Sequence, residues 1–227
     1  APMMEEYISG GTPDEEIKTL VAEYIDRSTG VQTIMQMKWL AAKVRELGRN
    51  PGAPTDPWFY KDEYNRRLMA EVARRRDAVL SGEYPRADWL VAGADEFLSL
   101  LCGHGVSLFA VSGTDECDVR AEAEALGLAR YFERDGVVHI AGAQNRSEGC
   151  SKEATLRRLI AGGGEPSELL VIGDGPVEIA LGREFGALTL GVASDEEKGE
   201  GTNPAKLRRL AAAGAHAIVA DFSEPQK

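Results

Sequence analysis

The hydrophobic residues in the first part of the chain recur at helical spacing. Thr12 and Pro13 resemble the start of a helix, and after an acidic first turn apolar side chains return every three or four positions: Ile17, Leu20, Val21, Tyr24 and Ile25. Residues 31–47 and 56–80 continue in the same way, and glycine follows each of them closely. No segment before residue 86 alternates as a half-buried strand does. The pattern predicts an all-α domain over residues 1–86.

Beyond residue 86, short apolar runs alternate with helical patterns. The predicted strands are 106–111, 137–140, 169–172, 187–192 and 217–220, and the predicted helices are 94–101, 115–126, 152–161, 176–185 and 204–212. Alternating units of this kind form a parallel sheet that helices cover on both faces. The sequence therefore predicts an α/β fold, in which a Rossmann-like, doubly wound core over residues 87–227 follows the helical domain.

Composition and charge narrow the classes of function. The 227 residues carry a formal net charge of -11, which argues against the clustered basic surface that nucleic-acid binding needs. We find no apolar run long enough to span a bilayer and no basic-then-apolar leader. The cysteines and histidines lack the spacing of zinc or CxxC sites: Cys102, Cys117, Cys150, His104, His139 and His216. We expect a cytoplasmic protein with reduced thiols, no nucleic-acid or membrane partner, and room for a small phosphorylated ligand at a local positive site.

Polar residues follow the predicted strand 106–111. The stretch AVSGTDE places the hydroxyl of Ser112 and the backbone N–H groups of Gly113 and Thr114 just before a predicted helix. In an open α/β sheet, ligands bind beyond the carboxyl ends of the strands, and such N–H groups bind phosphate. The alternative is that these residues only cap the following helix.

A second strand end carries two carboxylates. In LLVIGDGPVEIALG, the apolar run 169–172 leads into Gly173-Asp174-Gly175, and Glu178 follows Asp174 by four positions. The glycines permit a sharp turn and leave space near Asp174. Mg²⁺ takes a few carboxylate oxygens and completes its coordination with water and phosphate. The alternative is that Asp174 caps the next helix while Glu178 favours its dipole.

Lys152 lies between these two loops, at the start of the predicted helix SKEATLRRLI. A cation is unfavourable at a helix N-terminus, so an electrostatic reason for this lysine is expected. A solvated surface lysine is the alternative. A hydroxyl loop, a lysine and a carboxylate pair on successive α/β units would converge on one phosphoryl group.

This combination resembles the haloacid dehalogenase-like hydrolase superfamily, whose members are mostly phosphatases. The stretch LVAGADEFLSLLCGHGVSLFAVSGTDE is similar to the approach to the family's second motif, with Ser112 at the hydroxyl position, and Lys152 matches the lysine of the third motif. The stretch VIGDGPVEIALGREFGALTLGV resembles the fourth motif, with Asp174 as metal ligand and Glu178 where an aspartate is more usual. LRRLAAAGAHAIVADF is similar to the closing segment. The resemblance covers nearly the whole chain and implies that residues 1–86 form an α-helical (C1-type) cap inserted after the first motif.

One motif of that family is missing. Its first motif, a strand ending in DxDxT or DxDGT, supplies the nucleophile and the general acid, but no two aspartates of this chain lie two positions apart. The strand is normally central, between those that end at Ser112 and Ile172, so a core without it would have unpaired backbone groups. Because Ala1 begins what resembles the first cap helix, we expect a fragment of a longer protein, inactive by itself, with the motif upstream. The alternatives are a natural inactive variant or an unfamiliar strand in the gap.

The resemblance implies a phosphatase mechanism. An aspartate outside the given residues would form an aspartyl-phosphate that water hydrolyses. Mg²⁺, held by Asp174 with support from Glu178, would offset the repulsion between carboxylate and phosphate. Lys152, Ser112 and the Gly113 N–H would stabilise charge on the transferring oxygens. We expect a small phosphorylated metabolite, such as a sugar phosphate, as the substrate.

The cap would close over the substrate and select it. Thr29 or Gln32, in a polar turn that opens a helix, is the candidate to meet the leaving group, and an ordinary helix N-cap is the alternative. Within the same fold a dehalogenase or a phosphomutase is possible. A non-catalytic binding or regulatory domain is the hypothesis from a different class.

Overall fold

The computed structural model of the chain describes residues 1–28, 30–143, 152–196, 198 and 201–224. It separates into two compact units, Ala1–Arg74 (unit 1) and Arg75–Lys227 (unit 2). The division lies inside helix α4 (Pro57–Leu80), before the boundary that the sequence predicts at residue 86. The assignment of residues 1–86 to a cap and 87–227 to a core stays a prediction.

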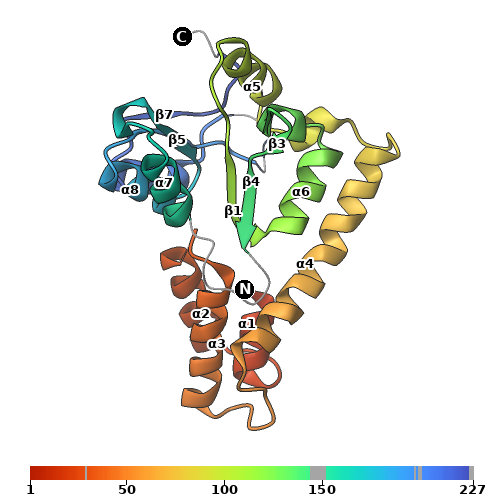
Figure 1. Cartoon of the computed structure of the whole chain (residues 1–227). Helices are drawn as coiled ribbons and strands as arrows, with labels where there is room; N and C mark the ends of the chain where they lie inside the picture. The colour runs from red at the N-terminus through yellow and green to blue at the C-terminus, as the bar shows by residue number, and fades with distance from the viewer. Residues whose placement is uncertain (29, 144–151, 197, 199–200, 225–227) are drawn as a thin grey trace. The chain divides into compact units, whose positions relative to one another are not determined.

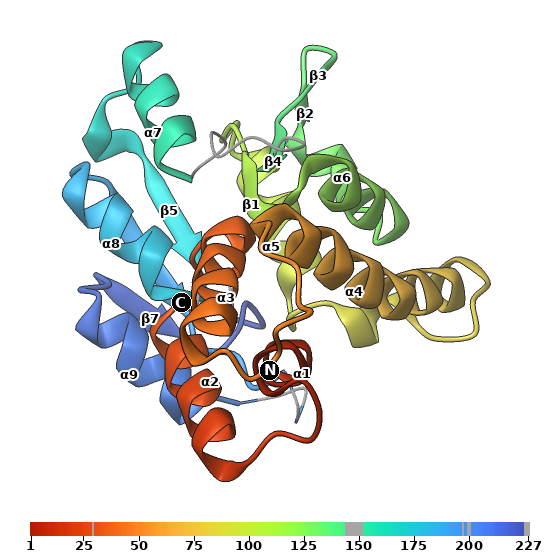
Figure 2. The same ribbon diagram turned by 90° about the horizontal axis from the view of Figure 1, so that it is seen from below.

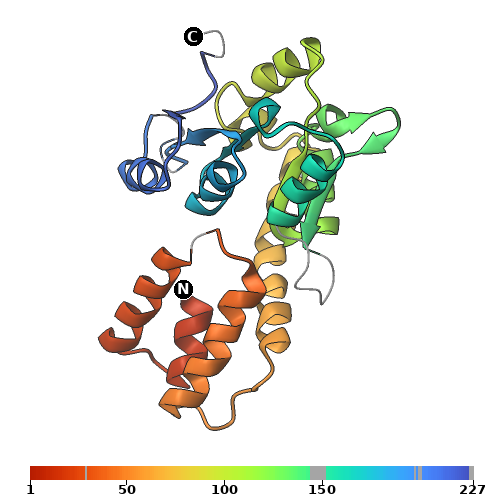
Figure 3. The same ribbon diagram turned by 60° about the vertical axis from the view of Figure 1, so that its left-hand side comes forward.

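Unit 1 is helical, in agreement with the apolar spacing of its sequence. It contains α1 (Pro2–Ser9), α2 (Glu15–Arg27), α3 (Thr33–Leu47) and most of α4. Helix α1 packs against both α2 and α3 (Figures 1 and 3). Across the described part of the whole chain, no helix has both the length and the apolar character that crossing a bilayer requires.

The helices of unit 1 begin and end at residues suited to those positions. The carboxylate of Asp14 accepts a hydrogen bond from the Ile17 N–H at 3.0 Å and so caps α2, and Gly10 ends α1 with a φ of 68°. The apolar faces meet in one buried cluster: Met3, Met4, Ile8, Ile17, Val21, Ile34, Met37, Leu40, Ala41, Val44 and Tyr60. Burial of these faces supplies most of the stability of such short helices.

Unit 2 alternates strands and helices. After the end of α4, the elements are η1 (Arg86–Trp89), α5 (Ala94–Gly103), β1 (Ala110–Asp115), α6 (Glu116–Ala125), η2 (Ala129–Phe132), β2 (Glu133–Arg134), β3 (Val137–Val138), β4 (Ile140–Ala143), α7 (Lys152–Ala161), η3 (Pro166–Glu168), β5 (Leu170–Gly173), α8 (Pro176–Glu184), β6 (Leu188–Val192), α9 (Pro204–Ala212) and β7 (Ala217–Val219). The predicted α/β architecture is confirmed.

The strands of unit 2 form two parallel sheets and a small hairpin among the described residues. β1 pairs with β4, β5 pairs with β6, β6 pairs with β7, and each of these pairs is parallel. Helix α6 packs on β1 and β4, whereas α8 packs on β5 and β6. Figure 2 shows β1 with β4 and β5 with its neighbours as separate groups of strands. The helices between successive strands are the crossovers that parallel pairing requires.

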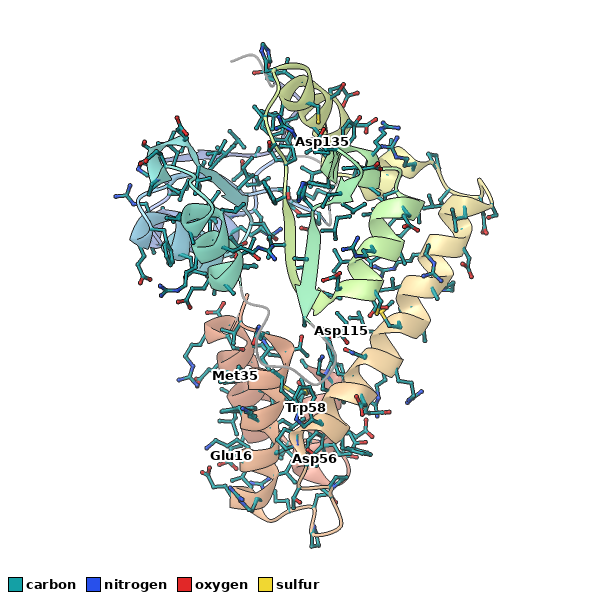
Figure 4. All side chains as sticks on the ribbon, in the orientation of Figure 1. Glu16, Met35, Asp56, Trp58, Asp115 and Asp135 are labelled. Carbon is teal, nitrogen blue, oxygen red and sulfur yellow. The ribbon has the colours of Figure 1, made fainter. Side chains whose placement is uncertain are left out.

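The strand predicted over 137–140 is wrong in its extent. Val137–Val138 is β3, which pairs antiparallel with β2, while β4 begins at Ile140 and pairs with β1. The hairpin turn is Asp135-Gly136, and both residues have positive φ, 52° and 74°. Asp135 lies at this turn in Figure 4. Asp-Gly between two short strands is a strong hairpin signal that the apolar pattern alone does not reveal.

Candidate active site

The turn between β5 and α8 is built around the side chain of Glu178. A β-carbon at Gly173 would lie 2.3 Å from Glu178 Cγ and 2.5 Å from its Oε1, and one at Gly175 would lie 3.0 Å from Oε1. Neither glycine has a positive φ, so a left-handed backbone does not explain them. Glycine at 173, and to a smaller degree at 175, is favoured because the side chain of Glu178 lies directly against the backbone of this turn.

Glu178 uses both of its carboxylate oxygens. Oε1 accepts a hydrogen bond from the Gly175 N–H at 2.8 Å, and Oε2 lies 2.7 Å from Lys152 Nζ. The side chain is only 10% exposed. Glu178 is the third residue of α8, and a glutamate there that reaches back to the N-cap N–H forms half of a capping box. This explains why a glutamate occupies a position where an aspartate is more usual.

Lys152 is the first residue of α7, and its side chain is 24% exposed. Its ion pair with Glu178 joins residues that are 26 positions apart. The structure therefore brings together two of the residues that the sequence predicts for one site. The expected electrostatic reason for a lysine at a helix N-terminus is the carboxylate of Glu178.

Asp174 pairs with a lysine that sequence reasoning missed. Its Oδ2 lies 3.0 Å from Nζ of Lys206, and the same ammonium lies 2.6 Å from Oε1 of Glu196. The Lys206 side chain is 13% exposed. Burial lowers the pKa of Lys206, but its hydrogen bonds to Glu196 and Asp174 outweigh burial, so the pKa is raised overall. Lys206 lies in the first turn of α9, where a positive charge is unfavourable, as it is for Lys152 in α7. A lysine in the first turn of a predicted helix is therefore the sequence signal that could have identified Lys206.

Ser112 and Gly113 lie inside β1 instead of in a loop after it. Val111 and Asp115 pair with Ala141 and Ala143, so the residues between them form a bulge. Ser112 Oγ accepts a hydrogen bond from the Thr114 N–H at 3.1 Å, and the space around Gly113 is open. Within the described residues, no hydrogen bond or ion pair joins this bulge to Lys152. Its role in phosphate binding stays a prediction.

The two cap residues are less informative. Thr29 lies outside the described residues. Gln32 is the N-cap of α3 in unit 1, but its side chain does not cap the helix. Gln36 lies in α3, and its Nε2 donates hydrogen bonds to the carbonyl oxygen and to Oγ of Ser28, each at 3.0 Å. Gln36 therefore links α3 to the end of α2, and the roles of Thr29 and Gln32 stay predictions.

The carboxylates at the end of β5 fit Mg²⁺ in part. Asp174 is 59% exposed and presents an oxygen ligand to solvent, as a metal that keeps several water ligands requires. Glu178 has both oxygens engaged by Gly175 and Lys152, which suits a supporting position better than direct ligation. In the part of the chain that the structure describes, no group of three or more His, Cys, Asp or Glu side chains could hold a metal ion. If Asp174 binds Mg²⁺, the remaining ligands would be water, phosphate or a carboxylate from outside the described residues.

A sequence profile of the haloacid dehalogenase-like hydrolases matches residues 11–186, which is most of the chain. The chain belongs to the haloacid dehalogenase-like hydrolases. The match includes Ser112, Lys152, Asp174 and Glu178, the residues on which the resemblance was based.

Solved structures of this family share the fold. A predicted phosphatase from Clostridium acetobutylicum is 16% identical with a TM-score of 0.59, and the match covers 99% of this chain and 87% of that one. A phosphonoacetaldehyde hydrolase-like protein from Oleispira antarctica is 17% identical with a TM-score of 0.53, covering 87% of this chain and 74% of that one. No curated protein matches the chain. At these identities the structural likeness shows the fold alone.

Proposed function

We propose that this haloacid dehalogenase-like hydrolase is a Mg²⁺-dependent phosphatase that acts on a small phosphorylated metabolite, such as a sugar phosphate. The observation that carries the proposal is the partly buried Lys152–Glu178 ion pair at the same strand end as the exposed carboxylate of Asp174. A lysine beside a potential metal ligand, at the carboxyl end of a parallel strand, suits the charge of a phosphoryl group.

Each residue has a distinct role in the proposed reaction. Lys152 binds a phosphoryl oxygen, and Glu178 holds its ammonium in place. Asp174 binds Mg²⁺, which when bound neutralises charge on the phosphate and lets an anionic nucleophile approach. Ser112 and the Gly113 N–H bind a second phosphoryl oxygen. We propose that the aspartate nucleophile lies in a segment outside the given residues, since these contain no DxD sequence.

The cap is proposed to control access to this centre. Closure of a helical domain excludes water and selects the substrate by its leaving group. Gln32 and Thr29 remain the proposed contacts. We propose a cytoplasmic location, which accords with the availability of phosphorylated metabolites and with scattered cysteines, of which Cys102 and Cys117 are free within the described residues.

Replacing Asp174 by asparagine in the full-length gene product tests the metal role. We expect Mg²⁺-dependent phosphate release from a panel of sugar phosphates to fall by at least about 100-fold, because the amide loses the charge that binds the cation. Asp135→Asn is the matched control, since Asp135 lies in the β2–β3 turn and is 93% exposed. Turnover that is undiminished in Asp174→Asn would refute the proposed metal ligand.

A non-catalytic binding domain is a second candidate, which the missing DxD sequence favours. It predicts that the full-length product binds inorganic phosphate in a Lys152-dependent way and releases none from any phosphorylated substrate with Mg²⁺. Turnover above background in the same panel would exclude this candidate.

A further inference from the structure

A cavity of about 420 Å³ lies in unit 2, and residues of β3, β4, α6 and α7 line it together with the chain around the start of β1. This volume falls in the range of about 300–1,000 Å³ that small-molecule sites occupy. None of the residues proposed for phosphoryl transfer lines this cavity: Ser112, Lys152, Asp174 and Glu178. It is therefore a candidate for a second site.

Arg158 is one of the arginines that line this cavity. It lies in the last turn of α7, it is exposed, and its side chain makes no hydrogen bond or ion pair with a described residue. The neighbouring Arg157 differs, because it pairs with Glu153 at 2.7 Å and lies over the ring of Phe185. A cation in the last turn of a helix is favourable by itself, so Arg158 indicates a ligand only together with its surroundings.

Arg120 of α6 also lines the cavity, and its guanidinium group is held in place. Its Nε donates to Oε1 of Glu116 at 2.9 Å, and its Nη2 donates to the carbonyl oxygen of Ile140 at 3.0 Å. Within the described residues its Nη1 has no hydrogen bond, so the N–H groups of that nitrogen are available to a ligand. Glu116 lines the cavity as well, and the charges of Arg120 and Arg158 against that one carboxylate leave an excess of positive charge.

The side chain of Thr155 supplies an independent observation. It lines the cavity and is only 5% exposed, and its hydroxyl makes no hydrogen bond with any described residue. Buried polar groups in folded proteins normally have a hydrogen-bond partner. A ligand in the cavity would supply that partner.

The rest of the lining is largely apolar. The rings of Phe109 and His139 lie 4.6 Å apart with their planes tilted by 49°, and the exposed side chains of Val137 and Val138 line the same cavity. An inorganic anion would leave these walls in contact with water, whereas an apolar body attached to the anionic group would cover them.

We propose that this cavity binds a small carboxylate with an apolar or aromatic body. The planar guanidinium groups of Arg120 and Arg158 match a carboxylate, which accepts paired hydrogen bonds from arginine. The hydroxyl of Thr155 donates a further hydrogen bond, and the body of the ligand covers the apolar walls. The proposal does not rest on phosphatase activity, because the cavity and the residues proposed for phosphoryl transfer are separate.

The probe that tests the proposal is 4-fluorobenzoate, added to the full-length gene product. Fluorine NMR measures its affinity, and nuclear Overhauser contacts between its ring protons and the protein locate it. We expect saturable binding and contacts with the methyl groups of Val138 and Ala141. These two residues decide the location because Thr155 also lines the larger cavity of unit 2, which Val138 and Ala141 do not line.

Matched variants and a neutral probe separate the proposed site from a general effect of charge. Arg158→Gln should weaken binding by at least about 10-fold, because a charge-assisted hydrogen bond is lost. Arg157→Gln removes the same charge one position away, outside the lining, and should leave binding unchanged. Thr155→Val keeps the size of the side chain and should weaken binding by about 3-fold. The uncharged 4-fluorobenzamide should bind at least about 10-fold more weakly than the carboxylate.

Five results would each overturn the proposal: no saturable binding, contacts of the probe without Val138 and Ala141, undiminished binding in Arg158→Gln or Thr155→Val, an equal loss in Arg157→Gln and Arg158→Gln, or equal binding of the amide. Circular dichroism of each variant checks that it is folded. Phosphate release from the sugar-phosphate panel is a separate measurement, so this proposal and the proposed function can fail independently.

Discussion

Gly173→Ala is the substitution for which the structure makes the sharpest prediction. The added methyl group would lie 2.3 Å from Glu178 Cγ and 2.8 Å from its Cδ, distances that no side chain tolerates. The Glu178 side chain must therefore leave its position, because the other contact partner, the β5 backbone, is fixed by pairing with β6. Two interactions are lost together: the capping hydrogen bond to Gly175 and the ion pair with Lys152.

The expected destabilisation follows from these two losses. A lost helix-capping hydrogen bond costs about 1 kcal/mol. Leaving the partly buried ammonium of Lys152 without its partner costs about 1–3 kcal/mol. We therefore expect Gly173→Ala to lower the free energy of unfolding of unit 2 by roughly 2–4 kcal/mol.

Guanidinium unfolding measures this change. Trp89 is the tryptophan of unit 2, and its fluorescence is isolated when Trp39 and Trp58 of unit 1 are replaced by phenylalanine. Gly103→Ala is the matched control, because Gly103 ends α5, has no positive φ and has open space around it. We expect the control to be neutral or slightly stabilising, since alanine is the better helix former.

A double-mutant cycle shows whether the cost passes through Glu178. If it does, Gly173→Ala costs less than about 1 kcal/mol in a Glu178→Ala background, because the clashing carboxylate is already absent. Additive costs, or a Gly173→Ala variant as stable as the Gly103→Ala control, would refute this explanation of the Gly-Asp-Gly turn.

Two further predictions concern charged groups. Lys206→Met should increase the affinity for Mg²⁺, because Asp174 loses a competing cation 3.0 Å away. Calorimetry on the full-length product measures this affinity, and unchanged or weaker binding of Mg²⁺ would contradict the proposed competition. Hydrogen bonds from Arg66 and Arg67 lower the pKa of Glu63 to about 2. Since the pKa of Glu63 in the folded protein lies below the ordinary value of 4.5, the stabilisation by Glu63 is present above that value and is lost as the pH falls from 4.5 toward 2. Glu63→Gln should therefore destabilise unit 1 by about 0.5–1 kcal/mol at pH 7 and make its acid unfolding less steep between pH 4.5 and pH 2. Circular dichroism at stepwise lower pH measures both effects. An equally steep acid transition in the variant and in the unaltered protein would refute this prediction.

The sequence was sufficient for the fold class, whereas the roles of the candidate site residues stay predictions. Helical spacing predicted α2, α3 and α4 to within about two residues, and the apolar runs located β5 and β6. These elements were predictable because their periodicity is local. The sequence placed Lys152 and Glu178 at one site because both follow the carboxyl ends of strands, but it did not predict their ion pair, and their roles stay predictions.

Other features depend on distant atoms and could not be predicted in the same way. The reason for Gly173 is the side chain of Glu178, which reaches back against the strand. The extent of β1 depends on which residues have a neighbouring strand, and this is a property of the assembled sheet. Helix α8 and strand β6 separate Asp174 from Lys206 in the sequence, so this ion pair could not be predicted from local spacing, although the unfavourable place of Lys206 in α9 could be recognised.

The strand edges of unit 2 also have a consequence for the behaviour of the chain in concentrated solution. Among the described residues β1 pairs with β4 alone and β5 with β6 alone, so each has an edge on which no strand is placed. Exposed apolar edges with free backbone groups are templates for pairing with other chains, and folded proteins normally block them with charges, proline or covering loops. Leu170 and Val106 are 48% and 45% exposed and line one cavity of unit 2. We therefore expect self-association at high concentration to begin at these edges.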